Sequence, residues 1–487
     1  MPAEAKRVDY KRAEVTQNLP TWELVRDCVS GERAVKAKRE TYLPKPNPED
    51  RSAANRVRYD QYLKRAVFYG VTGRTLHGLS GMVFTEPPVF EVDASLQPLV
   101  DNADGFGETL AQQIKVSLET VLSLGRGGLL VDFPRTTAPV TRSQLQQGEV
   151  QPVVRLYQPE SIINWRVTTN AGKRFLTLLV LEEHSEKPDD QGFGVTVQKL
   201  WRVYRRTAER GVTVEVWRKR EDDEVPVVSE PEAPIQDSAG KPFAEIPFVF
   251  LGVTGNTEVP DAAPLYDLSV INLAHYRNSA DFEESCFLIG QPTPFVTGVT
   301  ESWAKNVLKG EMRIGSRAVI ALPAGGSAGL LQAAPNQMTS ESMKDKERQM
   351  VAIGARLVQE KAIQRTATEA GMERQTEVSV LAAVAGNVAA GYTLALDFAG
   401  RFVGASKPAL VEVNTEFATS TMPVTDRAQL LLEFQAGLVT FEEARDNLRA
   451  AGVVWLDNGV AKEAVDAANL SSMKQEAAIM GGGDAPA

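Results

Sequence analysis

Residues that could carry out nucleophilic catalysis are sparse in this chain of 487 residues. The segment GGSAG around Ser327 matches the G-x-S-x-G pattern, which in esterases holds a nucleophilic serine on a turn between a strand and a helix. In that family the histidine follows the serine, whereas the last histidine of this chain is His275. A glycine-rich turn between strands explains the segment better, and a hydrolase that uses Ser327 is kept as an alternative.

Side chains that bind metals or phosphates are equally few. The three histidines, His77, His184 and His275, are about a hundred residues apart, and the sequence has no Cys-x-x-Cys motif. It also has no G-x-x-x-x-G-K-[ST] motif, and the acidic run at 221–224 is typical of a solvated charged segment beside a proline-rich stretch. The sequence therefore predicts no enzyme, no metal site and no cofactor.

Composition and charge place the chain among soluble globular proteins. It is 43% hydrophobic and 24% charged, and its formal net charge is −10. Tight duplex binding needs dense Lys and Arg to neutralise phosphates, so any contact with DNA must be local or weak. Residues 1–65 hold 15 Lys and Arg against 10 Asp and Glu, which we interpret as a solvated helical face. With two distant cysteines and no apolar leader, we expect folding in a reducing cytoplasm without disulfides.

Hydrophobic periodicity predicts a mainly helical first part. We expect helices at 19–40, 55–82 and 107–124, with Gly70 and Gly73 as kinks in the second. The glycine-rich residues 125–128 should stop the third helix and form a turn, and the apolar run LLVDF should follow as a buried strand.

The period then changes from helical to alternating. Residues 153–220 predict successive strands of an antiparallel meander, the first running through PVVRLYQPESIINWRVTT without interruption. The polar, proline-rich residues 221–247 are interpreted as a long surface loop or mobile insertion. A helix at 264–287, a compact mixed segment with a short helix at 300–308, and two helices after 426 complete the prediction.

Two long helical patterns within 339–402 organise the rest of the chain. In the first, apolar residues follow one side while residues 344–348, including Lys344, Lys346 and Arg348, fill the other. The second, from about residue 373, carries no charge over 378–396 and should be buried on all sides. Its length also permits a membrane span, which we keep as an alternative, although its small residues favour close packing between protein surfaces.

This order of elements carries a resemblance to a known family. A helix pair ending in FTEPPVF, the meander with RLYQPESIINW, the helix PLYDLSVINLAHYRNSADFEESCFLIGQP, the small unit with RAVIALPAGG and the double helix at 339–402 follow one another. The succession resembles the portal proteins of tailed double-stranded DNA bacteriophages, over roughly residues 50–450. The motifs are patterns of type and order, so the specificity comes from the succession.

The resemblance implies an α+β portal fold with a mostly helical wing and crown, an antiparallel meander in the wing, a helical stem and a small α/β clip. The implied division is an N-terminal segment and wing at 1–261, a stem helix at 262–288, a clip at 289–338, a second stem helix at 339–359, a tunnel loop at 360–372, a long buried helix and wing return strand at 373–420, and a crown with a flexible tail at 421–487.

The resemblance further implies a structural function. Such proteins form a ring, commonly of twelve subunits, at one capsid vertex of the virion, through which DNA is packaged and later ejected. The implied partners are double-stranded DNA in transit, the terminase large subunit, a head-tail connector or adaptor protein, and major capsid and scaffold proteins, with assembly in the host cytoplasm and no membrane. Lys361 and Arg365 in the tunnel loop are expected to contact DNA, with Lys344, Lys346 and Arg348 as channel-facing candidates.

Overall fold

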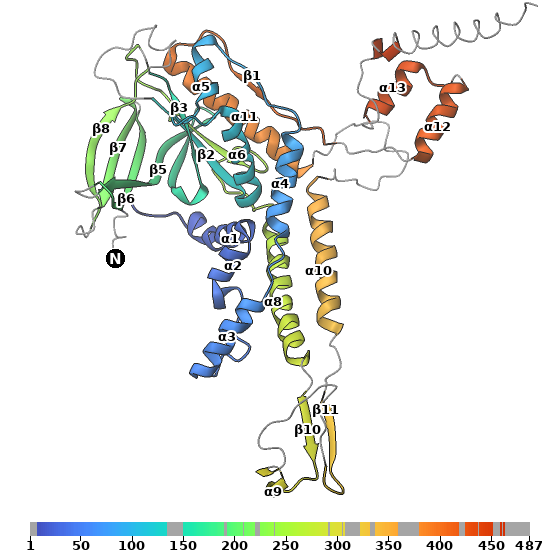
Figure 1. Ribbon diagram of the computed structural model, residues 1–487. Helices are drawn as coiled ribbons and strands as arrows, with labels where there is room; N and C mark the ends of the chain where they lie inside the picture. Colours follow the sequence, from blue (N-terminus) through green and yellow to red (C-terminus); the bar gives the residue numbers. More distant parts are fainter. Residues whose placement is uncertain are drawn as a thin grey trace, which may run out of the picture. The chain divides into compact units, whose positions relative to one another are not determined.

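The computed structural model describes the chain except residues 1–6, 134–149, 189–191, 208, 220–224, 238, 291–292, 304, 307–321, 332–336, 359–378, 418–423, 437, 451–457, 460 and 463–487. The chain divides into two compact units, Met1–Thr415 and Glu416–Ala487 (Figure 1). The first unit combines long helices with antiparallel sheets, and the described part of the second holds the helices α12 (Val424–Gln435) and α13 (Phe441–Ala450). The protein is therefore of the α+β class, as predicted.

The N-terminal helices differ from the prediction in where they break. Helix α1 (Ala13–Ser30) begins earlier than residue 19, and Gly31, with a φ of 90°, separates it from α2 (Glu32–Ala37). The predicted helix at 55–82 is two helices, α3 (Ala53–Arg65) and α4 (Val71–Val83). Gly70 caps α4, whereas Gly73 lies inside it. Gly73 is where α1 approaches α4 closely, because a Cβ there would lie 2.7 Å from the carbonyl oxygen of Val29.

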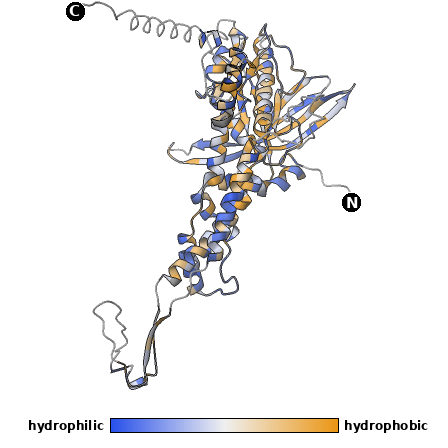
Figure 2. Cartoon of the chain, turned by 90° about the vertical axis from the view of Figure 1, so that its right-hand side faces the viewer, coloured by the Kyte–Doolittle hydropathy of each residue, from blue (hydrophilic) through white to orange (hydrophobic). Residues whose placement is uncertain are grey.

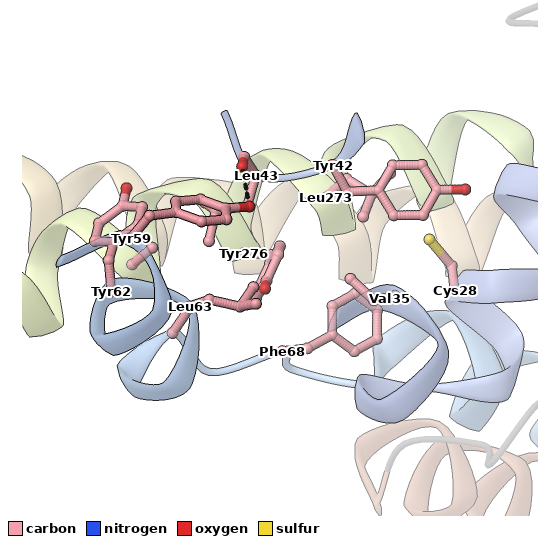
Figure 3. Close-up of a cluster of buried hydrophobic side chains, with 12 residues drawn as sticks. Cys28, Val35, Tyr42, Leu43, Tyr59, Tyr62, Leu63, Phe68, Leu273 and Tyr276 are labelled. Atoms are coloured by element: carbon pink, nitrogen blue, oxygen red, sulfur yellow. Dashed lines mark hydrogen bonds between the residues drawn. The ribbon is translucent and has the colours of Figure 1, made fainter. Parts of the chain in front are cut away.

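Helices α1 and α3 share a core with α8 (Tyr266–Ile289) (Figure 3). Three of its four tyrosines have bonded hydroxyls: Tyr42 donates to Asp27 at 2.7 Å, Tyr59 to the carbonyl of Leu43 at 2.8 Å and Tyr62 to Asp281 at 2.6 Å. Such partners remove the cost of burying a hydroxyl. The cluster consists of Cys28, Val35, Tyr42, Leu43, Tyr59, Tyr62, Leu63, Ala66, Phe68, Leu273, Tyr276 and Ala280.

A three-stranded sheet in the order β3-β2-β9 forms the centre of the first unit. Helix α6 (Leu110–Leu124) ends at Gly125, whose φ is 73°, and β2 (Arg126–Asp132) starts at the next residue. The predicted turn at 125–128 is therefore wrong beyond Gly125. Gly128 is needed within the strand because a Cβ there would collide with Phe248 of β9 (Phe248–Gly252).

The predicted first strand of the meander is two strands in different sheets. β3 (Val153–Tyr157) pairs with β2, and the short 3₁₀ helix Pro159–Ser161 leads into β4 (Ile162–Asn170). β4 continues into a five-stranded antiparallel sheet with β5 (Lys173–Pro188), β6 (Val195–Thr207), β7 (Gly211–Lys219) and β8 (Val227–Pro234). The meander itself is confirmed.

The expectation of a long loop at 221–247 is wrong for its centre. β8 pairs with β7 from Val227 to Pro234, with irregular register around Val216. An edge strand can accept Pro231 because one side of its backbone needs no ladder partner. The prolines therefore mark an edge strand here and not a loop.

The remaining elements follow in chain order. After α8 come β10 (Thr293–Thr297) and α9 (Glu301–Trp303), and β11 (Ser327–Leu331) pairs with β10 before α10 (Gln337–Arg356) begins. Helices α8 and α10 lie side by side, and hydrophilic and hydrophobic residues are mixed along both (Figures 1 and 2). Helix α11 (Val380–Val403) packs on α6, β2 and β9 and is followed by β12 (Leu410–Glu412), which pairs with β1 (Val89–Glu91). The first unit also contains η1 (Arg39–Thr41), η2 (Ala94–Leu96) and α5 (Gln97–Asp101).

Candidate nucleic-acid interface

Helices α8 and α10 contact each other along a narrow seam. Met350 is buried in it, the Asn278 amide donates to the Ser342 hydroxyl at 2.8 Å, and a ring nitrogen of His275 lies 3.3 Å from Glu347. Met350 is the buried residue of α10, so most of this helix faces away from α8. One face of α10 is therefore exposed.

The three cations predicted on α10 do not share that face. Lys344 and Arg348 are both exposed and, being four residues apart, lie on one side of the helix. Lys346 is half-buried and donates to Ser342, the residue that bonds to α8. Arg348 is also paired with Asp345 at 3.2 Å. The prediction that residues 344–348 all fill the polar side is wrong, because a helix turns 100° per residue and five consecutive residues surround it.

Lys361 and Arg365, the two predicted tunnel-loop cations, lie outside the described residues. The residues that flank them are described. The backbone N–H of Leu381, at the start of α11, donates to the carbonyl of Leu357, just after α10, at 3.1 Å. The chain therefore leaves α10 and enters α11 at the same point, with both cations in between.

The expectation that α11 is buried on all sides is only partly met. Leu394 is 42% exposed, and Ala390 and Arg401 are also exposed, which leaves a strip along one side. Of the described helices, α11 is the one long and apolar enough to cross a membrane, and 56% of its most apolar window is buried within the protein. Packing against α6, β2 and β9 accounts for the apolar sequence.

Polar residues of α11 bind it to the rest of the unit. The Asn387 amide donates to the carbonyls of Gly252 and Val253 at 3.2 and 2.8 Å, and Asn256 donates back to the Asn387 carbonyl at 2.7 Å. Tyr392 donates to Gln113 at 3.1 Å and lies 2.8 Å from the Ser117 hydroxyl, and burial raises its pKa. The Asn387 bonds fix α11 to the end of β9 and the loop that leads into α8, and the Tyr392 bonds fix it to α6. The sequence signalled them only as isolated polar residues in an uncharged run.

Asp261 fixes the other side of that loop. Its carboxylate accepts from the backbone N–H groups of Val253 and Thr254 at 2.7 and 3.0 Å and from the Thr254 hydroxyl at 2.7 Å. At Gly125, a Cβ would lie 2.5 Å from the Asp261 carbonyl oxygen. The end of α6 and the loop that leads into α8 are therefore packed too closely for any side chain at 125.

Arg126 is a charged residue whose role the sequence did not indicate. It is 1% exposed, and its guanidinium lies 4.1 Å from the ring centroid of Trp165 and 4.8 Å from that of Phe250. No described residue accepts a hydrogen bond from any of its three side-chain nitrogens. Burial lowers the pKa of Arg126 to about 9. The two aromatic faces are thus its main stabilising contacts.

The catalytic alternative finds little support in the described residues. Ser327 is the first residue of β11 and pairs with Thr297 of β10, so it does not lie on a turn between a strand and a helix. His275 contacts Glu347 and the ring of Tyr69. The described part of the chain contains no group of three or more His, Cys, Asp or Glu that could hold a metal ion.

Comparisons with known proteins match part of the chain to a family of unknown function and match the chain to distant solved structures. Residues 264–403, from the start of α8 to the end of α11, match a family described as a domain of unknown function, DUF4055. Among the solved structures that match is a chain titled "Neck of native GTA particle computed with C12 symmetry", with 14% identity over 79% of this chain and 92% of that chain and a TM-score of 0.36. A likeness that distant carries no argument about function. No curated protein matches the chain.

Proposed function

We propose that this protein is a non-enzymatic portal subunit, which forms a ring-shaped channel for double-stranded DNA at a capsid vertex. The observation that carries the proposal is the α8–α10 hairpin. Its two helices bury a narrow seam against each other and leave one face of α10 exposed, with Lys344 and Arg348 on it. A helix pair of this kind can line a bore when it is repeated around an axis.

The number of subunits follows from the width of a helix. If one helix per subunit lines the bore at ~10 Å spacing, six subunits leave an opening of roughly 10 Å and twelve leave roughly 28 Å. Only the larger opening admits a duplex. We therefore propose a ring of about twelve, in agreement with the family that the order of elements resembles.

The charge of the chain supports a channel in which DNA slides. A net charge of −10 provides few phosphate contacts, so a duplex is not held tightly. Lys361 and Arg365, on the segment that begins and ends beside Leu357 and Leu381, supply two cations per subunit. We propose that these cations contact DNA and retain it. We also propose that β10 and β11 belong to a clip on which a terminase and a connector dock. The three-stranded and five-stranded sheets would belong to a wing that faces capsid and scaffold proteins.

Mass photometry and negative-stain imaging of the purified chain test the ring. At 53.1 kDa per subunit, a twelve-subunit ring weighs about 640 kDa. The expected result is a closed ring of about that mass with a central opening. Only monomers and dimers at every salt concentration would overturn the proposal.

A further inference from the structure

Phe106 is displayed to solvent on a rigid loop. Its side chain is 93% exposed, although it lies between two well-ordered elements, α5 and α6. The Asn102 side-chain oxygen accepts from the N–H groups of Gly105 and Gly107 at 3.0 and 2.8 Å. The Asp104 carboxylate accepts from the N–H groups of Phe106 and Glu108 at 2.7 and 3.2 Å. Four backbone groups of the loop are thus held by two side chains.

This loop is attached to one edge of the central sheet. Ala103 is fully buried, and its carbonyl accepts from the N–H of Val154 in β3 at 2.8 Å. Its N–H donates to the Glu108 carbonyl at 2.7 Å, which closes the loop at its base. An exposed aromatic side chain costs free energy by ordering water, and a rigid loop loses no further conformational entropy on binding. Both properties are typical of a pre-organised interface anchor.

The opposite edge of the same sheet has an apolar cavity. In the order β3-β2-β9, β9 is the other edge strand, and three of its residues form the base of a cavity of about 280 Å³. Leu394 of α11 is 42% exposed at its side, and Arg174 and Glu258 form an ion pair at its polar end. The cavity is lined by Val167, Arg174, Leu176, Phe248, Val249, Phe250, Asn256, Thr257, Glu258 and Leu394.

Size and chemistry match a phenyl ring to this cavity. An apolar cavity of about 150 Å³ holds benzene, so 280 Å³ is sufficient for the side chain of a phenylalanine. Phe106 does not fill the cavity of its own chain: its side chain is 93% exposed, and its loop is attached to β3, at the other edge of the sheet from β9. A projection and a complementary cavity on different sides of one molecule define a head-to-tail contact, which closes into a ring when the rotation permits.

We propose that Phe106 of one copy of this chain inserts into the cavity beside β9 of the next copy. This inference rests on the ring proposed above. It names the residue that joins neighbouring copies in that ring, which the predicted channel residues do not explain. The polar end of the cavity, with Arg174 and Glu258, forms the rim that excludes water around the ring.

Photocrosslinking tests the contact directly. The full-length chain carries p-benzoylphenylalanine in place of Phe106, is assembled, irradiated, digested and analysed by mass spectrometry. The expected result is crosslinking between chains, to peptides that contain Phe248–Gly252, residues 256–258 or Leu394. Crosslinks between chains that map elsewhere would overturn the inference.

Substitution gives the energetic test. Phe106→Ala is expected to raise the subunit concentration needed for assembly by about 30-fold, the loss of one aromatic anchor. Because the side chain is exposed, the thermal midpoint of the unassembled chain should stay unchanged. Phe193→Ala is the matched control: Phe193 is 94% exposed, between β5 and β6, and its removal should leave assembly unchanged.

The outcomes separate the two proposals. If rings form and Phe106→Ala assembles like the Phe193→Ala control, the anchor is wrong and the ring stands. If the wild-type chain forms no ring under any condition, the portal proposal and the anchor both fail.

Discussion

Two glycines of α11 provide a matched test of how closely this helix packs. A Cβ built at Gly391 would lie well inside the van der Waals radius of a methyl carbon of Leu251, a fully buried residue of β9, and 3.4 Å from the Asn256 amide nitrogen. At Gly386, five residues earlier in the same helix, a Cβ would meet nothing within 4 Å. Substitution by Ala therefore brings the same gain in helix propensity at both positions, but it causes a steric collision only at position 391.

The magnitudes follow from these two terms. Replacing a helical glycine by Ala stabilises by about 1 kcal/mol, so Gly386→Ala should raise the free energy of unfolding by about that amount. Overpacking costs about 1–3 kcal/mol, so Gly391→Ala should be less stable than Gly386→Ala by about 1–3 kcal/mol. Urea unfolding followed by circular dichroism, on the unassembled chain, measures the difference without contributions from neighbours.

A second variant identifies the cause. In a Leu251→Ala background the colliding methyl carbons are absent, so the cost of Gly391→Ala should disappear and leave only the helical gain. The expected coupling between the two positions is about 1–3 kcal/mol. Equal stabilities of Gly391→Ala and Gly386→Ala, or no coupling to Leu251, would refute the close packing of α11 on β9.

Two further predictions concern charge. Arg126→Met should be neutral or up to about 3 kcal/mol more stable at pH 7, because it removes an unpaired buried charge. Burial lowers the pKa of Arg126 to about 9, so above that pH the folded chain binds fewer protons than the unfolded chain. Urea unfolding between pH 8 and 10.5 should therefore show that the wild type becomes more stable relative to the variant as the pH rises. A fall in the relative stability of the wild type over this range would contradict the prediction. Replacing both Lys361 and Arg365 by Ala should leave ring assembly intact and reduce the DNA packaged or retained in particles, measured by genome content. Full-length, stably held genomes would show that these cations do not serve the DNA.

The sequence by itself determined the elements whose patterns are local. The alternating residues within 153–220 predicted the meander, and the uncharged run predicted the long helix α11, since strand and helix periods are properties of neighbouring residues. Gly125 was correctly identified as a helix stop because a positive φ is a local requirement. The absence of a Walker motif was likewise read directly from the amino-acid sequence.

Other features depended on contacts between distant segments. Residues 221–247 looked like a loop because prolines and acids are common in loops, whereas pairing with β7 made part of them an edge strand. Residues 344–348 looked like one polar side of α10, whereas the bonds of Ser342 to Lys346 and to Asn278 show that part of this run lies on the side that meets α8. The sequence did not indicate the burial of Arg126, the exposure of Phe106 or the cavity beside β9. Each of these depends on how the strands pair and which edge of the sheet each strand forms. Tertiary structure decided these features because each depends on which surfaces meet, and local periodicity does not encode that.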